Sequence, residues 1–183
     1  MKIESLRDLY VEQLKDLYNA EQQLIKALPK MAKAASSEEL RAAFESHLEE
    51  TRQHAQRIET IFEQMGEKAR GKKCKAMEGL VAEGGEVIEE DMENSIKDAA
   101  LIAAAQRVEH YEIAGYGCVG AYATKLGEDD AATLLSQTLE EEKEADKALN
   151  DIAEGLSLEV PQESSQSENR TAKTSSRRSK SAA

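Results

Sequence analysis

The chain has 183 residues, of which 40% are hydrophobic and 33% charged, enough for one domain with a buried core. Its net charge of −12 argues against a body that binds nucleic acid, and no apolar run approaches the roughly 20 residues that a membrane span needs. Cys74 and Cys118 are too few and too far apart for a disulfide framework or a zinc knuckle, so we expect a reduced, cytoplasmic protein without a signal peptide.

The first part of the chain is predicted to form two long helices. The first covers residues 3–35, and Pro29 is expected to kink or break it near its end. The second begins after Ser36, whose spacing to Glu39 is that of a capping box, and it stops at Gly66. Because the connection is so short, the two helices are expected to be antiparallel neighbours.

The second part repeats this plan after a different kind of segment. Residues 67–95 contain a basic patch and then a short helix, expected to be broken at Gly84-Gly85. Two more long helices are predicted over 96–126 and about 129–155. Two hairpins with one long crossover between them favour an all-α, four-helix bundle over residues 1–156.

The two hairpins also align on each other without a gap at an offset of 91 residues. Apolar positions fall on apolar positions, as in Leu17 with Val108. An internal repeat of this kind predicts a pseudo-twofold bundle. It also pairs the acids, Glu21 with Glu112 and Glu50 with Glu141.

Two of these acids stand where a carboxylate is hardest to explain. Glu21 and Glu112 each lie at the centre of an apolar helix stripe, with Glu109 about 60° to one side of Glu112. A charge there is unfavourable unless a hydrogen-bonded partner, a cation or a metal compensates it. His110 points the opposite way and is not expected to be a ligand.

The other two long helices can supply further ligands. Glu50 lies on the flank of its core face, with His47 three residues before it and His54 four after it. On the last helix Glu141 matches Glu50 in the repeat, while Glu142 points more directly inward. Carboxylates from every helix with an imidazole suit a pair of divalent ions such as iron or manganese.

The alternative is that these residues have only a structural role. Glu50 and Glu141 lie in Glu-rich runs, which are typical of solvated helix flanks. His54, taken alone, is typical of a partly buried surface histidine. The repeat is what favours the metal site, because it brings the acids to equivalent positions.

These residues also carry a resemblance to a known family. The segments YNAEQQLIKALPKMAKAA (18–35), HLEET (47–51), CKAMEGL (74–80), DAALIAAAQRVEHYEIAGYG (98–117) and LEEEK (139–143) resemble the YciF/YciE-type bacterial stress-response proteins of the ferritin-like superfamily. The resemblance implies a ferritin-like bundle, a homodimer and a carboxylate-bridged site for two iron ions, with manganese as the alternative. The implied ligands are Glu21, Glu50, Glu112 and Glu141, with His47, Glu109 and Glu142 as further candidates. The chain departs from rubrerythrin-like sites, because Gln53 and Glu144 stand where those have histidines.

Three functions remain open on this basis. The first is a di-metal protein that reacts with peroxide or dioxygen and needs an external reductase. The second is a metal-binding or structural stress protein without turnover. The third is weak association with nucleic acid through residues 157–183, a Ser/Lys/Arg-rich tail with five basic residues that is expected to be disordered.

Overall fold

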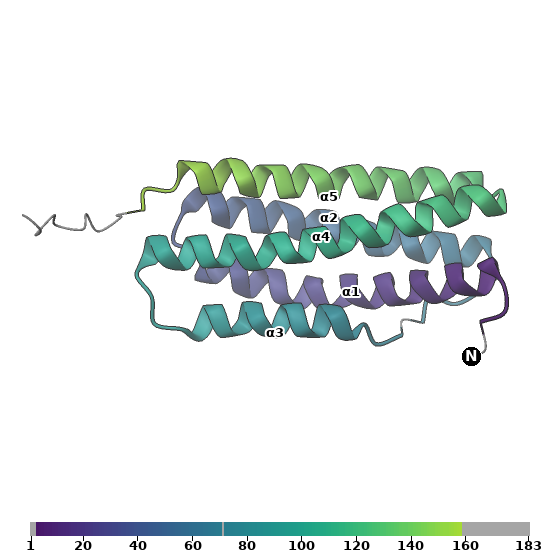
Figure 1. The fold of residues 1–183 in the computed structure, drawn as a ribbon, viewed down its shortest axis with the longest axis horizontal. Helices are drawn as coiled ribbons and strands as arrows, with labels where there is room; N and C mark the ends of the chain where they lie inside the picture. Colours follow the sequence, from purple (N-terminus) through teal and green to yellow (C-terminus); the bar gives the residue numbers. More distant parts are fainter. Residues whose placement is uncertain (1–2, 71, 159–183) are drawn as a thin grey trace, which may run out of the picture.

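The computed structural model describes residues 3–70 and 72–158, and these form five α-helices. They are α1 (Leu6–Ala34), α2 (Glu38–Gln64), α3 (Lys75–Glu89), α4 (Asn94–Leu126) and α5 (Asp129–Gly155). Helices α1, α2, α4 and α5 run side by side as a bundle, while the shorter α3 lies outside it against α1 and α4 (Figure 1). The predicted all-α bundle with a long crossover is therefore confirmed. Apart from residues 157 and 158, the predicted tail lies outside the described residues.

The internal repeat is visible in the helix boundaries. Shifting both ends of α2 by 91 residues gives both ends of α5. Equivalent contacts also recur: Asp98 accepts hydrogen bonds from the backbone of Ser36 and Ser37, and the matching position Arg7 pairs with Glu128. The two hairpins are thus related by an approximate twofold axis.

The core is divided into two apolar clusters. One contains Leu28, Phe44 and Leu101, and the other contains Leu14 and Phe62. Between them the four long helices bury a layer of polar side chains, each no more than 6% exposed: Glu21, His47, Thr51, His54, Glu109, Glu112, Thr138 and Glu142. The fold therefore places its buried glutamates at mid-bundle, away from either end.

Three local features differ from expectation: the break at Pro29, the break at Gly84-Gly85 and the cap of α2. Helix α1 continues through Pro29, and α3 continues through Gly84 and Gly85. Helix α2 is capped by the hydroxyl of Ser37, which accepts from the backbone N–H of Leu40 at 3.3 Å. At Pro29 and at Gly84-Gly85 the buried residues nearby hold the helix against the bundle, and this packing outweighs the low helix propensity of proline and glycine.

None of the helices in the described part of the chain is long and apolar enough to cross a membrane.

Candidate metal centre

The buried polar layer brings together six side chains that can bind metal. Helix α1 contributes Glu21, α2 contributes two histidines, α4 contributes two glutamates one turn apart, and α5 contributes Glu142. The spacing from Glu109 to Glu112 and from His47 to His54 keeps each pair on one helix face. All six side chains are turned inward because the apolar residues beside them pack into the two clusters.

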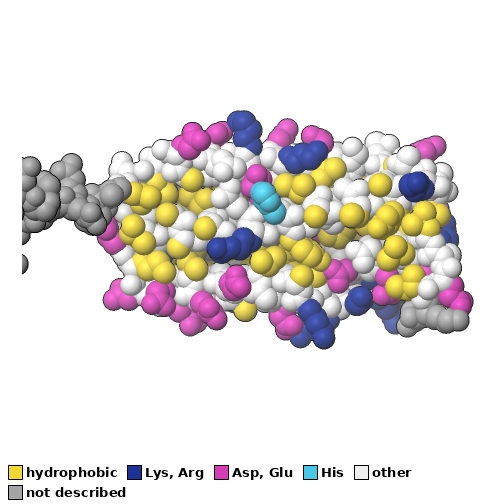
Figure 2. All heavy atoms as spheres, in the orientation of Figure 1, with side chains coloured by type: hydrophobic (Ala, Val, Ile, Leu, Met, Phe, Trp, Pro, Cys, Tyr) yellow, Lys and Arg dark blue, Asp and Glu magenta, His cyan; other side chains and the backbone are white. Residues whose placement is uncertain are grey.

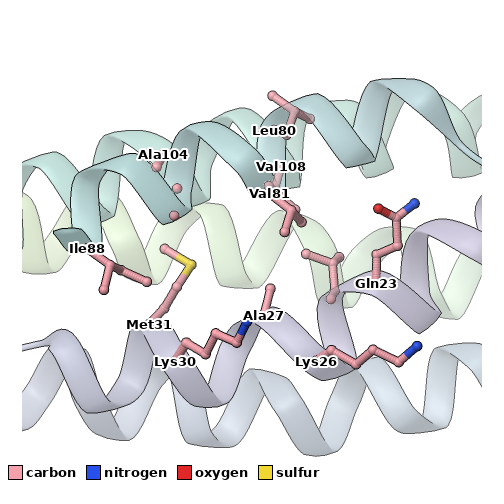
Figure 3. Close-up of a pocket in the computed structure, with 13 residues that line it drawn as sticks. Gln23, Lys26, Ala27, Lys30, Met31, Leu80, Val81, Ile88, Ala104 and Val108 are labelled. Atoms are coloured by element: carbon pink, nitrogen blue, oxygen red, sulfur yellow. The ribbon is translucent and has the colours of Figure 1, made fainter.

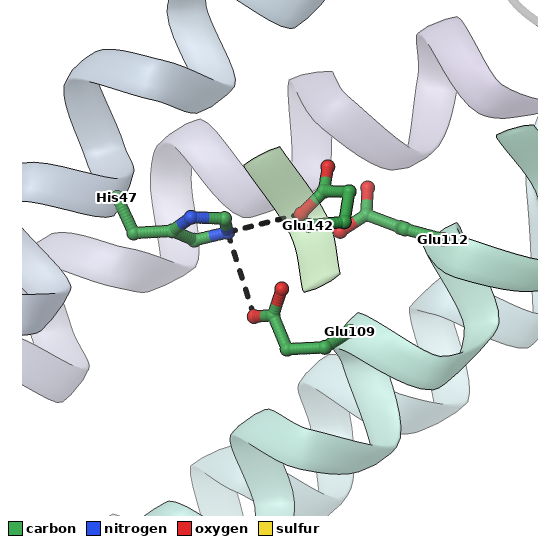
Figure 4. A group of neighbouring side chains, drawn as sticks. All are labelled: His47, Glu109, Glu112 and Glu142. Atoms are coloured by element: carbon green, nitrogen blue, oxygen red, sulfur yellow. Dashed lines mark ion pairs between the residues drawn. The ribbon is translucent and has the colours of Figure 1, made fainter. Parts of the chain in front are cut away.

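The first group of ligand atoms comes from His47, Glu109, Glu112 and Glu142, which offer atoms within 4.8 Å of one another. The Nε2 of His47 lies 3.4 Å from Glu109 Oε1 and 3.7 Å from Glu142 Oε2. Figure 4 shows His47 reaching from its helix towards both carboxylates, with Glu112 beside Glu142. One imidazole nitrogen thus converges with three carboxylates.

The second group adjoins the first and shares a residue with it. Glu21, His54 and Glu142 also offer atoms within 4.8 Å of one another. The Nδ1 of His54 lies 3.0 Å from Glu142 Oε1 and 3.9 Å from Glu21 Oε1. Glu142 therefore has one oxygen near each histidine, as a ligand that bridges two positions would.

The hydrogen bonding of this layer is incomplete. Buried atoms without a hydrogen-bond partner among the described residues include both carboxylate oxygens of Glu112 and of Glu142, one oxygen of Glu21 and of Glu109, and one nitrogen of each histidine. The histidine nitrogens lie close to carboxylates as ion pairs but without hydrogen-bond geometry, whereas the oxygens of Glu112 have neither kind of contact with the described residues. Such groups in a native protein are unusual unless an ion or another group satisfies them. Their lone pairs converge, so the residues fit a metal site.

Protons would otherwise have to offset the clustered charge. Burial and the nearby Glu142 raise the pKa of Glu21 to about 8. Burial also raises the pKa values of Glu109 and Glu112. Burial lowers the pKa of His47, but Glu109 and the other neighbouring carboxylates outweigh it and raise that pKa to about 10. The metal-free layer therefore holds protons where divalent cations could replace them.

Two further carboxylates lie behind the histidines rather than among the converging atoms. Glu141 Oε2 lies 2.9 Å from His54 Nε2, and its carboxylate also accepts hydrogen bonds from Arg57. Glu50 Oε2 lies 3.3 Å from His47 Nδ1. Each histidine thus has one nitrogen facing the centre and the other on a carboxylate, an arrangement that orients metal-binding imidazoles.

The structure brings together five of the seven predicted ligands, namely Glu21, His47, Glu109, Glu112 and Glu142. Glu50 and Glu141, which the repeat pairs, each contact the outer nitrogen of a histidine instead. His54, which taken alone was expected to be a partly buried surface histidine, is fully buried within the second group. The signal that could have placed it is its spacing of two helical turns from His47. His110 is exposed and lies 3.3 Å from Asp146, as expected for an outward residue.

Comparisons with known proteins agree with this architecture. The family described as "Domain of unknown function (DUF892)" matches residues 5–160. The chain is 49% identical to Protein YciF of Escherichia coli over 154 residues, covering 84% of this chain and 93% of that protein. The crystal structure of that E. coli stress protein superposes with a TM-score of 0.81, covering 84% of this chain and 97% of the other.

Two further solved structures extend the comparison. A protein of Rhodopseudomonas palustris described as a putative structural protein is 44% identical, with a TM-score of 0.79 and coverage of 81% of this chain and 95% of the other. The bacterioferritin-related protein of Bacteroides fragilis, described as a dodecameric thioferritin, is 19% identical with a TM-score of 0.62 over 82% of this chain and 87% of that one. At that identity the likeness concerns the fold alone, and the fold is ferritin-like.

Proposed function

Because the chain belongs to the DUF892 family that includes YciF, we propose that it is a ferritin-like stress protein whose buried layer binds two divalent metal ions. The ligands would be Glu21, His47, His54, Glu109, Glu112 and Glu142. The observation that carries the proposal is the convergence of unsatisfied, buried carboxylate and imidazole atoms on two adjoining positions. The stress role follows the description of the E. coli relative.

The donor set favours iron or manganese. Four carboxylates and two imidazoles suit these metals better than soft cations, which prefer sulfur ligands. When bound, a pair of iron ions would supply redox chemistry towards peroxide or dioxygen. The protein would hold the ions in a layer closed by apolar clusters, with Glu141 and Glu50 fixing the two imidazole rings.

The electrons for repeated turnover would have to come from outside. The chain has two cysteines, which cannot build a four-cysteine iron centre. Cys74 precedes α3 and Cys118 lies on α4. We therefore propose an external reductase if the protein turns over, and stoichiometric oxidation of bound iron if it does not.

Metal analysis tests the proposal directly. Protein purified without chelators should contain iron or manganese, and the metal-free protein should take up about two Fe(II) ions per chain under anaerobic titration. Mixing the loaded protein with peroxide in a stopped-flow instrument should give a ferric absorption band faster than protein-free buffer does. A protein that binds neither metal on titration would refute the site; binding without accelerated oxidation would leave a non-catalytic metal protein.

We also propose that the protein is a homodimer. The exposed face of helix α4 carries the small or apolar side chains Ala103, Ala114, Cys118 and Ala121, with Arg107 and His110 among them. Figure 2 shows hydrophobic side chains along the middle of this face, with a histidine and a basic side chain among them and most of the acidic side chains nearer its edges. Small residues on an exposed helix face permit close approach of a second helix, and an exposed patch of apolar side chains is typical of an interaction surface.

Two other expectations stay predictions. Two free cysteines suit a reducing compartment such as the cytoplasm. The weak contact with nucleic acid depends on a tail that lies almost wholly outside the described residues.

A further inference from the structure

A second feature of the fold is a cavity beneath α3, separate from the buried polar layer. It has a volume of about 260 Å³ and lies between α1, α3 and α4. Its walls are mostly apolar and include Met31, Val81 and Ile88. Figure 3 shows Val81 and Ile88 extending from α3 towards α1, and Met31 extending from α1 towards α3.

The glycines of α3 keep this space open. Gly84 and Gly85 line the cavity, and a Cβ atom added to either would meet nothing within 4 Å. Glycine inside a helix lowers stability by about 1 kcal/mol relative to alanine, so close packing does not explain this pair. The absence of side chains at these two positions instead leaves space for the cavity beneath α3.

The cavity also carries positive charge at its edge. Lys26 and Lys30, one turn apart on α1, are exposed, and both line the cavity. Neither forms an ion pair with any described residue. Like charges at this spacing repel each other, and in a chain of net charge −12 two unpaired lysines beside an apolar cavity favour an anionic head group.

We propose that this cavity binds a free, single-chain fatty acid, with the carboxylate near Lys26 and Lys30 and the tail beneath Gly84 and Gly85. The volume is below that of typical drug-sized sites, which favours one chain over a two-chain lipid. A methylene group is about the size of a water molecule, roughly 30 Å³, so the cavity accommodates roughly eight carbons. The basic tail of the chain is a poorer occupant, because its charge has the same sign as the lysines.

Calorimetric titration of the full chain with straight-chain carboxylates of four to twelve carbons tests the proposal. Affinity should rise about fourfold for each methylene until the tail reaches roughly eight carbons, and then level off. Octanol, with a neutral head group, and octyltrimethylammonium, with a cationic one, should bind several-fold more weakly than octanoate. Equal binding of all three head groups, or no saturable binding, would overturn the proposal.

Matched variants locate the site. Lys26→Gln with Lys30→Gln should weaken octanoate binding about fivefold or more, whereas Lys33→Gln, on the same helix outside the cavity, should not. Gly84→Leu should abolish binding by filling the space, whereas Gly79→Leu, on α3 but exposed, should leave it intact. If Gly84→Leu fails to fold, the smaller Gly84→Ala should still weaken binding of the longest tails. Octanoate binding unchanged in the lysine variant would refute the assignment.

Discussion

Glu112 is the side chain whose environment is least compatible with a metal-free protein. It is fully buried, and neither carboxylate oxygen has a hydrogen-bond partner among the described residues. We predict that Glu112→Leu removes most of the bound metal and raises the stability of the metal-free protein by about 1–3 kcal/mol, because it removes an unsatisfied polar group. Metal content by mass spectrometry and chemical denaturation after chelation measure the two effects.

The control is an acid outside the layer. Glu144→Gln, on the exposed face of α5, should leave both metal content and stability unchanged. If Glu112→Leu retained the full metal content, the assignment of Glu112 as a ligand would fail.

The two carboxylates behind the histidines should differ in importance. The side chain of Glu141 is 25% exposed and held by Arg57, whereas that of Glu50 is 41% exposed. We predict that Glu141→Gln weakens metal affinity about 10- to 100-fold, and that Glu50→Gln weakens it less because water can replace its contact. Competition titration against a chelator dye ranks the two variants; equal losses would show that exposure does not set their roles.

The pH dependence of the protein's stability follows from the pKa values of Glu21 and His47. The pKa of Glu21 rises from 4.5 to about 8, and that of His47 from 6.5 to about 10, in the folded, metal-free protein. A raised pKa stabilises the fold below the unfolded value, and this stabilisation disappears as pH rises through the folded value. The metal-free protein should therefore lose stability as pH rises from 4.5, the pKa of Glu21 in the unfolded chain, to about 10, the pKa of His47 in the folded protein, while added Mn(II) stabilises it increasingly over the same range. Denaturation curves with and without Mn(II) check the sign, and rising stability of the metal-free protein would contradict it.

The sequence could place Glu21 and Glu112 in the core, because a residue at the centre of an apolar helix stripe must point into the bundle. For residues at the edges of the stripes, the sequence did not distinguish those that face the inner histidine nitrogens from those that contact the outer ones. Glu141 and Glu142 differ by about 100° in direction, and only the packed bundle decides which of them meets the histidines. His54 was missed for the same reason, since its burial depends on α5 lying against α2.

At the scale of elements, Asp98 fastens one hairpin to the other. It is 3% exposed and accepts hydrogen bonds of 2.8 and 2.9 Å from the backbone N–H groups of Ser36 and Ser37 at the start of α2. We predict that Asp98→Ala destabilises the protein by about 1–2 kcal/mol, because it removes the acceptor of two part-buried N–H groups near a helix N-terminus.

The repeat provides the matched control. Arg7 occupies the equivalent position and pairs with Glu128, but their side chains are 50% and 32% exposed. Exposed pairs contribute little, so Arg7→Ala should change the free energy of unfolding by less than about 1 kcal/mol. Similar losses in both variants, measured by urea denaturation, would contradict this account.

The long helices and their order could be predicted because their apolar periodicity is strong and occurs twice. The breaks expected at Pro29 and at Gly84-Gly85 are absent for a physical reason. Pro29 is exposed, while Met31 and Ala32 beyond it are buried and hold the last turn of α1 against the bundle. In α3, burial of Met77 and partial burial of Val81 and Ile88 likewise outweigh the low helix propensity of two glycines.

For the whole molecule, the exposed face of α4 predicts the assembly state. Ala114→Glu places a charge in the middle of that face and should convert a dimer into a monomer. Ser136→Glu, on the exposed face of α5, should not. Sedimentation velocity distinguishes the two states, and a wild-type chain that sediments as a monomer at micromolar concentration would refute the dimer.

The internal repeat also frees the two halves to diverge. In a pair of identical hairpins around a true twofold axis, every substitution would occur twice. Here one peptide chain joins the halves, so equivalent positions of the repeat can carry different residues. Thr51 is equivalent to Glu142, and Thr138 is equivalent to His47. Glu21 and Glu112 still form a symmetric pair, whereas the imidazoles belong to one half alone. Covalent fusion thus allows each of the two ligand groups to change by single mutations, which identical halves could not do.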